Sequence, residues 1–406
     1  MEKRRTSLRS FAQATVVGLL LAAAIVSAWF EFTPVASIAD TRAAALIFAL
    51  AAALLALPKV LRPLPSLARG AWIAASATAL AVALFALVLL FGMYGEEEVR
   101  FRSGELVLAG TLFLPEEAGP HPAVVFIHGS GRAERREFGW HAKFLARHGI
   151  AALIYDKRGS GESGGNTFET GYDGYAADAA AAIDALRSRT DIRSECIGIA
   201  GHSEGGWVAS IVASGLAPEV AFVIVTSTTD LSPARQVLYE TGSSMRAADF
   251  PPDAVRRATD LQRRVLASQR SGTADPALEQ ELAAAAAEPW FSTAELPDRL
   301  YPPDEYAWWR SVMDFDPFAH WRGVRAPVLA ISGGLDLNSD VRASQAAIRQ
   351  ALRSGGNEDF TGVVFPRMEH GGIEWWLPGR IPPPRFPEGY PELLLEWTRR
   401  KTDACG

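Results

Sequence analysis

Cysteine and positive charge are both scarce in this sequence, and each shortage excludes a class of protein. The 406 residues include only 2 cysteines, too few for a disulfide scaffold or a cysteine-ligated zinc site. Lysine and arginine total 40 against 46 aspartates and glutamates, which gives a net charge of −6. Nucleic-acid-binding domains are normally basic, so we expect no nucleic-acid partner. Charged residues are 21% and apolar residues 49% of the chain, which excludes a disordered protein.

The apolar residues are concentrated in the first 95 positions. Residues 11–30 and 71–95 carry no charged side chain, and each run can supply the ~20 residues of helix that cross a bilayer. The uncharged run 43–57 is shorter, and Arg42 and Lys59 would have to reach toward the headgroups to complete it. A buried or re-entrant helix is the alternative for this middle run. The sequence therefore predicts about three transmembrane helices, over residues 11–30, 42–59 and 71–94.

The basic residues between these runs predict the orientation of the chain in the membrane. The first ten residues hold four basic side chains and one acid, and residues 58–70 hold three basic side chains and no acid. Residues 31–42 hold one basic side chain and two acids, and three glutamates follow Gly95. Excess lysine and arginine marks the cytoplasmic side. Three spans would make this a multi-pass membrane protein whose larger, C-terminal part is extracytoplasmic, whereas loss of the middle span would return that part to the cytoplasm.

From residue 96 onward, patterns of strands and helices alternate. Continuous apolar runs at 123–127, 150–155 and 220–225 indicate strands that are buried on both faces. Residues 134–148 and 172–189 between them have helical spacing. Alternation of this kind predicts a parallel sheet with helices on both faces, which is an α/β fold.

The alternation stops near Asp230 and the next strand pattern begins at Pro327. The residues between have helical segments and nine aromatic side chains between positions 289 and 321. We therefore expect one α/β domain over residues 96–406, with a helical lid inserted at about 231–318 and laid over the sheet. The aromatic residues either contact an apolar acyl or aromatic group of a substrate or pack the lid onto the sheet.

The motif Gly-His-Ser-Glu-Gly at residues 201–205 directly follows the predicted strand 196–200 and opens a helical pattern. G-x-S-x-G between a strand and a helix indicates a nucleophile elbow, a tight turn that holds the serine hydroxyl out at the edge of the sheet. Ser203 is therefore the predicted nucleophile. A second G-x-S-x-G at residues 161–165 leads into a loop instead of a helix, so we interpret Ser163 as structural.

A serine hydroxyl needs a base to accept its proton, and after this elbow the expected chain order is serine, acid, histidine. Of the seven histidines only His370 follows the last predicted strands, so it is the predicted base. Asp336 is the first carboxylate after the predicted strand 327–331. Its predicted role is to orient the imidazole ring and stabilise its charged form. Asp340 is the alternative acid.

The oxyanion that forms during acyl transfer needs two backbone N–H donors. One is expected from Glu204, the residue after the nucleophile. The other is expected from the loop 128–131, where glycines let the backbone approach a substrate. Ser130 is favoured as this second donor, with Gly131 as the alternative. We expect His128 to order the loop and not to act as a base.

Together these motifs resemble the α/β-hydrolase superfamily, and they are most similar to its serine carboxylesterase, serine peptidase and acyl-thioesterase branch, in which Gly-His-Ser-x-Gly-Gly is common. The resemblance covers residues 96–406. It implies an eight-stranded, mostly parallel sheet, a lid after the sixth strand, and an acyl-enzyme mechanism without metal or organic cofactor. Two features depart from the pattern: the acid loop lacks the proline often found past the aspartate, and the membrane spans are not part of the family.

The sequence thus predicts a membrane-anchored serine hydrolase, with carboxylesterase activity as the first expectation. Its predicted partners are a small acyl substrate and the lipid bilayer. A serine peptidase or an acyl-thioesterase with the same catalytic residues is the alternative within this class. An alternative of a different class is a membrane protein that keeps the domain as a non-catalytic binding module. The presence of serine, acid and histidine in the expected order favours the enzyme.

Overall fold

The structure, a computed structural model, describes residues 94–216, 220–273, 275–300, 306–374 and 385–405. The three predicted transmembrane helices lie outside these ranges, except for Tyr94 at the end of the last one. Tyr94 begins a strand, so the sheet starts two residues before the predicted domain boundary at residue 96, and the transmembrane spans stay predictions. Among the residues that the structure describes, no helix combines the length and apolar character needed to cross a bilayer.

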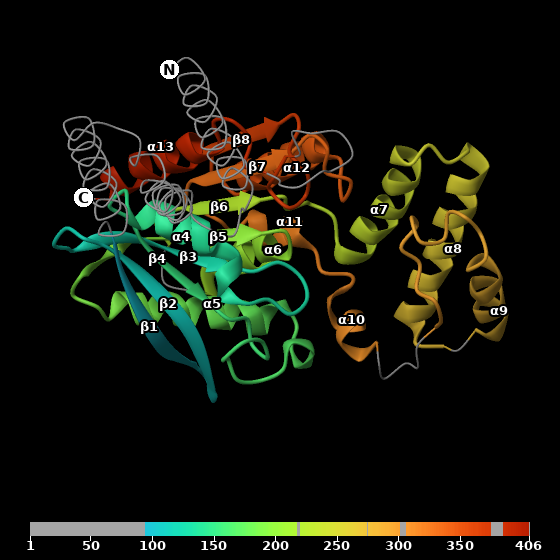
Figure 1. The fold of residues 1–406 in the computed structure, drawn as a ribbon, viewed down its shortest axis with the longest axis horizontal. Coiled ribbons are helices and arrows are strands. Elements are labelled where there is room, and N and C mark those ends of the chain that lie inside the picture. The colour runs from blue at the N-terminus through green and yellow to red at the C-terminus, as the bar shows by residue number, and fades with distance from the viewer. Residues whose placement is uncertain (1–93, 217–219, 274, 301–305, 375–384, 406) are drawn as a thin grey trace, which may run out of the picture.

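Eight strands form a single sheet in the order β1-β2-β4-β3-β5-β6-β7-β8 (Figure 1). In chain order they are β1 (Tyr94–Ser103), β2 (Leu106–Pro115), β3 (His121–Ile127), β4 (Ala151–Tyr155), β5 (Ile192–His202), β6 (Val223–Thr226), β7 (Val328–Gly333) and β8 (Phe360–Phe365). β1 and β2 pair antiparallel, as do β2 and β4. All other neighbours are parallel. The eight-stranded, mostly parallel sheet implied by the family resemblance is therefore confirmed.

The helices that the structure describes are of two kinds, those that cover both faces of the sheet and those of the lid (Figure 1). They are α4 (Gly139–Ala146), α5 (Tyr172–Arg187), α6 (Glu204–Ile211), α7 (Pro233–Ala247), α8 (Pro252–Ser271), α9 (Pro276–Ala285), α10 (Ala307–Val312), α11 (Pro317–Trp321), α12 (Val341–Ser354) and α13 (Tyr390–Asp403). Successive residues of β3 alternate between two buried clusters, so that Val125 packs with α5, α6 and α12 while Val124 packs with α4 and α13. Because both faces are buried, the strand is apolar throughout.

Among the elements that were not predicted are β1 and α7, and each has polar positions that hide its pattern. β1 is an edge strand whose first half, with Glu96, Glu97 and Glu98, is exposed. Charged side chains are common on edge strands because they discourage pairing with other chains. α7 mixes polar residues and a glycine with few apolar ones. The predicted helix 134–148 is also shorter than expected, since residues Arg135–Phe138 form a 3-10 turn before α4.

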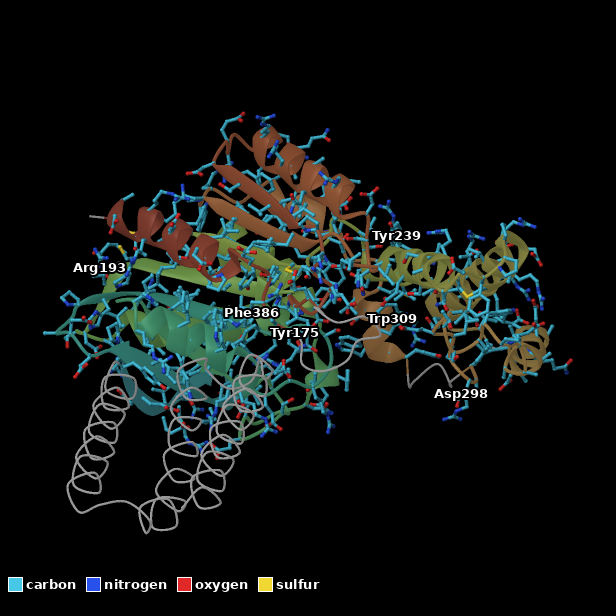
Figure 2. The ribbon with its side chains drawn as sticks, turned by 45° about the horizontal axis from the view of Figure 1, so that its top comes forward. Tyr175, Arg193, Tyr239, Asp298, Trp309 and Phe386 are labelled. Carbon is cyan, nitrogen blue, oxygen red and sulfur yellow. The ribbon has the colours of Figure 1, made fainter. Side chains whose placement is uncertain are left out.

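The lid follows β6, as predicted, but it is not laid over the sheet. α8 and α9 project to one side of the sheet, beyond α7 (Figure 1). They have a hydrophobic cluster of their own, which includes Leu261, Leu282 and Trp290. Figure 2 shows Tyr239 on α7 and Trp309 on α10 where the lid joins the rest of the molecule. The apolar face of α8 is thus buried within the lid, so this helix needs no contact with the sheet.

The aromatic residues of the lid region mainly pack the protein. Trp290 is buried inside the lid, and Trp321 is fully buried in the main core. The indole N–H of Trp308 donates to the Thr170 carbonyl at 2.7 Å, and that of Trp309 to Gln269 on α8 at 2.9 Å. For these residues, packing is the alternative that the structure supports.

Candidate active site

Ser203 lies in a strained turn between β5 and α6. Its backbone has φ 53° and ψ −118°, a conformation that is rare for any residue except glycine and that recurs at functional sites. The neighbouring glycines make the turn possible. A Cβ on Gly201 would lie 2.2 Å from the carbonyl oxygen of Gly205, and a Cβ on Gly205 would lie 2.3 Å from that of Ile127. Side chains at these positions would push α6 away from β3 and β5.

The structure brings the three predicted catalytic side chains into one hydrogen-bonded chain. Nε2 of His370 lies 2.9 Å from the hydroxyl oxygen of Ser203. On the other edge of the ring, Nδ1 lies 2.9 Å and 3.1 Å from the two carboxylate oxygens of Asp336. Asp336 follows β7 and is buried, and His370 follows β8. Since β5, β7 and β8 run parallel, their carboxyl ends carry all three side chains to one edge of the sheet.

The alternative acid, Asp340, has a different position. Its side chain accepts a hydrogen bond from the backbone N–H of Ala343 at 3.1 Å and caps the N-terminus of α12. Aspartate is a preferred residue at this position of a helix because it satisfies an N–H that has no partner within the helix. The structure therefore places Asp336, and not Asp340, against the histidine.

The second G-x-S-x-G forms a buried turn. The hydroxyl of Ser163 donates to the carbonyl of Asp156 at 2.7 Å and accepts from the backbone N–H of Ala109 at 3.0 Å. These bonds tie the loop after β4 to β2. The position of Ser163 agrees with its interpretation as a structural residue.

The two segments expected to supply the oxyanion donors lie next to each other. A Cβ on Gly129 would be only 3.5 Å from Cβ of Ser203, so the Gly129–Ser130 peptide lies beside Ser203. Glu204 is the first residue of α6, and N–H groups of a first helical turn have no acceptor within the helix. His128 Nε2 lies 2.7 Å from the Tyr155 carbonyl, so this side chain joins the loop to β4.

Sequence reasoning missed one residue of this region, Lys157. Its ammonium nitrogen lies 2.6 Å from Oε1 of Glu204 and 2.8 Å from the carbonyl oxygen of Gly129. Lys157 and Glu204 are 47 positions apart and both are almost fully buried. No spacing rule links positions so distant. The available signal was the lysine itself, because a lysine in the loop after a buried strand is unusual.

Two further ionisable groups lie near His370. Burial, together with the charge of His370, lowers the pKa of His202 to about 4, and the two rings are 5.6 Å apart. His202 is therefore neutral at neutral pH. On the lid helix α7, burial and the nearby charge of Glu295 raise the pKa of Glu240 to about 7. α7 is held near the loop that contains Asp336, because the hydroxyl of Ser243 donates to the Leu337 carbonyl.

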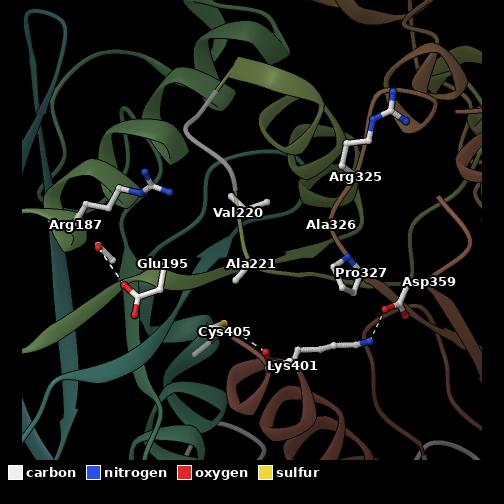
Figure 3. A pocket seen from close by; sticks show the side chains of 12 residues that line it. Arg187, Glu195, Val220, Ala221, Arg325, Ala326, Pro327, Asp359, Lys401 and Cys405 are labelled. Atoms are coloured by element: carbon white, nitrogen blue, oxygen red, sulfur yellow. Dashed lines mark hydrogen bonds and ion pairs between the residues drawn. The ribbon is translucent and has the colours of Figure 1, made fainter. Parts of the chain in front are cut away.

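A hollow of about 600 Å³ lies at the opposite edge of the sheet (Figure 3). Its lining comes from the amino ends of the parallel strands, including Glu195 in β5, Ala221 before β6 and Pro327 before β7. Lys401 on its wall pairs with Asp359 at 2.6 Å. The hollow is thus separate from the edge that carries Ser203. Over the described ranges, no group of three or more His, Cys, Asp or Glu side chains is arranged to hold a metal ion.

An eight-stranded sheet of this order, with a nucleophile elbow after β5 and a lid after β6, defines an α/β-hydrolase. Residues 104–363 match the family model of the X-Pro dipeptidyl-peptidase (S15 family). This match covers more than half of the chain, so the protein belongs to that family of hydrolases.

Similarity to individual proteins is more distant. Over 114 residues the chain is 34% identical to a thiohydrolase, aneE, of Aspergillus aculeatus, a stretch that covers 28% of this chain and 35% of that protein. The chain therefore spans about a third of the length of this curated relative.

Similar solved structures include two enzymes from an archaeon and a bacterium. An esterase from Pyrococcus furiosus is 16% identical, with a TM-score of 0.48 over 76% of this chain and 90% of that one. A proline iminopeptidase from Mycobacterium smegmatis is 17% identical, with a TM-score of 0.49 over 76% of this chain and 100% of that one.

Proposed function

We propose that this protein is a membrane-anchored serine hydrolase that cleaves carboxylic esters through an acyl-enzyme on Ser203. The observation that carries the proposal is the 2.9 Å contact between Ser203 and the His370 ring, whose other edge is held by Asp336. In the first step Ser203 Oγ attacks the ester carbonyl while His370 Nε2 accepts the hydroxyl proton. His370 then gives this proton to the departing alcohol. Asp336 keeps the ring in the required tautomer and stabilises the imidazolium.

Deacylation repeats these steps with water as the nucleophile. His370 accepts a proton from water, and the resulting oxygen attacks the acyl carbon. The tetrahedral intermediate collapses, the acid leaves, and Ser203 Oγ recovers its proton from the imidazolium. In both halves the negative charge develops on the former carbonyl oxygen, and the N–H groups of Ser130 and Glu204 are the proposed donors to it.

A peptidase or thioesterase activity of the same residues is the second candidate. Membership of a family described as an X-Pro dipeptidyl-peptidase favours the peptide bond, and the partial relative described as a thiohydrolase favours the thioester. The acyl-enzyme and its hydrolysis are common to the three reactions. They differ in the group that leaves first, and an amine leaving group depends most on protonation by His370.

The proposed membrane anchor is the N-terminal region. Its support is the sequence alone, in which residues 11–30 and 71–95 are uncharged and flanked by basic residues on the expected side. Together with the middle run this arrangement would place the catalytic domain outside the cytoplasm.

A fluorophosphonate probe tests the nucleophile, because it reacts with activated serines. The whole chain in mild detergent should be labelled, Ser203→Ala should lose the label, and the matched change Ser163→Ala should keep it. Labelling that survives in Ser203→Ala would contradict the proposal. If labelling behaves as expected, rates on p-nitrophenyl esters of graded chain length, thioesters and aminoacyl amides then decide which acyl bond is preferred.

A further inference from the structure

Lys157 connects the two segments that surround the nucleophile. It lies in the loop after β4, and its side chain passes between the loop that follows β3 and the start of α6. The ammonium group contacts the Gly129 carbonyl at 2.8 Å, the Glu204 carboxylate at 2.6 Å and the face of the Tyr175 ring at 4.3 Å. Lys157 is 5% exposed and Glu204 is 3% exposed. A buried charge pair with every donor directed at a partner is held in one arrangement.

The contact with Gly129 affects the N–H of the next residue. The Gly129 carbonyl and the Ser130 N–H belong to the same peptide unit, which is planar and trans, so they point in opposite directions. Holding the carbonyl on Lys157 therefore directs the Ser130 N–H away from the lysine. The same ammonium charge withdraws electron density through the peptide and makes that N–H a stronger donor. Since this peptide lies beside Ser203, its orientation is relevant to the oxyanion.

The contact with Glu204 has a second, electrostatic effect. The buried Glu204 carboxylate shares the Lys157 ammonium group with the Gly129 carbonyl, and the backbone N–H of Glu204 is one of the proposed donors. Burial raises the pKa of this carboxyl and Lys157 opposes the rise. A carboxylate without a partner here would repel a developing negative charge at short range in a medium of low dielectric constant. The ammonium group of Lys157 cancels much of that field.

We propose that Lys157 is a positioning residue for the oxyanion hole: it fixes the Gly129–Ser130 peptide and neutralises Glu204, so that both proposed donors can serve a tetrahedral intermediate. This inference rests on the proposed function, since it concerns the reaction of Ser203. Lys157 itself does not touch the substrate. It acts through the backbone of Ser130 and the charge of Glu204, so its effect belongs to the transition state and not to substrate binding.

The test compares two double variants in the whole chain, purified in mild detergent. Lys157→Met with Glu204→Gln removes the pair without leaving an unpaired buried charge, so the fold should survive. The matched control is Arg158→Met with Asp178→Asn. In this neighbouring pair Asp178 is buried and Arg158 is partly buried, with a 2.6 Å contact between them, and none of the bonds made by the pair involves Gly129 or Glu204.

The readout is inhibition by an alkyl trifluoromethyl ketone, with p-nitrophenyl butyrate as substrate. Ser203 Oγ adds to the ketone carbon, its proton moves to His370 Nε2, and the ketone oxygen becomes an oxyanion. Loss of one oxyanion donor costs about 10²–10³-fold in rate, so a misdirected donor should cost about 10–100-fold in kcat and in inhibitor affinity with KM nearly unchanged. The control variant should lose thermal stability and keep its inhibitor affinity relative to KM.

Two outcomes would overturn the proposal while leaving the nucleophile assignment intact. In one, the Lys157→Met, Glu204→Gln variant keeps its kcat and its affinity for the ketone. In the other, both double variants lose kcat and affinity equally, which would mean that a buried pair in this region acts only through stability. Failure of the proposed function gives a different result, because hydrolysis and ketone binding would then persist in Ser203→Ala.

Discussion

Nδ1 of His370 lies 2.9 Å from one carboxylate oxygen of Asp336 and 3.1 Å from the other. One edge of the imidazole ring is thus held by both oxygens of a buried carboxylate, which places a proton on Nδ1. The lone pair of Nε2 is then directed at the Ser203 hydroxyl. Asp336 also accepts from the backbone N–H of Asn338 at 2.9 Å, which fixes the carboxylate in its own loop. Asp336 thus orients His370, the proposed base, before any substrate binds.

Replacing either of two neighbouring aspartates by asparagine should therefore have very different effects on kcat. Asp336→Asn should lower kcat by about 10³–10⁴-fold, because an amide no longer selects the productive tautomer. Asp340→Asn should leave kcat unchanged and shift stability by less than about 0.5 kcal/mol, because asparagine caps helices about as well as aspartate. Steady-state kinetics on a p-nitrophenyl ester and thermal unfolding measure both effects. A large loss of kcat in Asp340→Asn alone would show that the acid has been misassigned.

Residues that lie next to each other in sequence or at the ends of predicted strands could be located before the structure was known. β8 has the predicted bounds, and Ser203, Asp336 and His370 occupy the predicted strand ends because apolar runs mark the strands that carry them. Chain order favoured Asp336 over Asp340 but left Asp340 as an alternative. Both follow β7, and only the loop conformation decides which side chain turns toward the histidine.

Contacts between loops were outside the reach of sequence patterns. The Lys157–Glu204 pair depends on how closely α6 approaches the end of β3, which in turn depends on Gly205. The lid was located by its composition, but its placement was wrong, because an amphipathic helix such as α8 does not reveal which partner buries its apolar face. In this lid the partners are α9 and Trp290 and not the sheet.

Gly205→Ala should damage both stability and activity. Its Cβ would lie 2.3 Å and 2.7 Å from the backbone carbonyl oxygens of Ile127 and His128, which cannot move aside as a side chain could. We expect a loss of at least ~1–3 kcal/mol in the free energy of unfolding from overpacking, and a fall in kcat as α6 shifts away from the loop 128–131. The free energy of unfolding in urea and the rate on a p-nitrophenyl ester measure the two effects.

Gly139→Ala is the matched control for that change. Gly139 starts α4 with φ −54°, and a Cβ there would meet no atom within 4 Å. Alanine should therefore raise stability by about 0.4–1 kcal/mol, since it restricts the unfolded chain without strain in the folded one. Equal effects of the two alanines would contradict the argument from close approach.

Glu240 should make the stability of the folded domain depend on pH. Its pKa rises from 4.5 to about 7, chiefly because of burial and secondarily because of Glu295, with His370 acting in the opposite direction and Asp336 adding to the rise. The folded state then binds more protons than the unfolded state between these values. The contribution of Glu240 to the stability of the folded state is therefore fully present below pH 4.5 and is lost as the pH rises to about 7.

The measurement is the melting temperature of the whole chain from acidic to mildly alkaline pH. Relative to the unsubstituted protein, Glu240→Gln should gain stability as the pH rises through this window and keep that gain above it. Glu295→Gln should shift the window to lower pH, because it removes a like charge from the neighbourhood of Glu240. Parallel melting curves for Glu240→Gln and the unsubstituted protein at every pH would contradict the prediction.

The last prediction places the catalytic domain outside the cytoplasm. Basic residues are abundant before residue 11, scarce in 31–42, abundant in 58–70 and absent from the acidic stretch Glu96–Glu98. This alternation fits three crossings, and all these segments lie within the ~15–20 residues of a span end over which the rule applies. Alkaline phosphatase is active only outside the cytoplasm, so a fusion after Gly95 should be active and one after Arg62 inactive. Green fluorescent protein at the same two positions should give the reverse pattern, since it fluoresces when retained inside. The side on which the domain lies depends on whether the short middle run, residues 43–57, crosses the membrane. If it fails to cross, the Gly95 fusion becomes inactive in the phosphatase series and fluorescent in the other, and the domain is cytoplasmic.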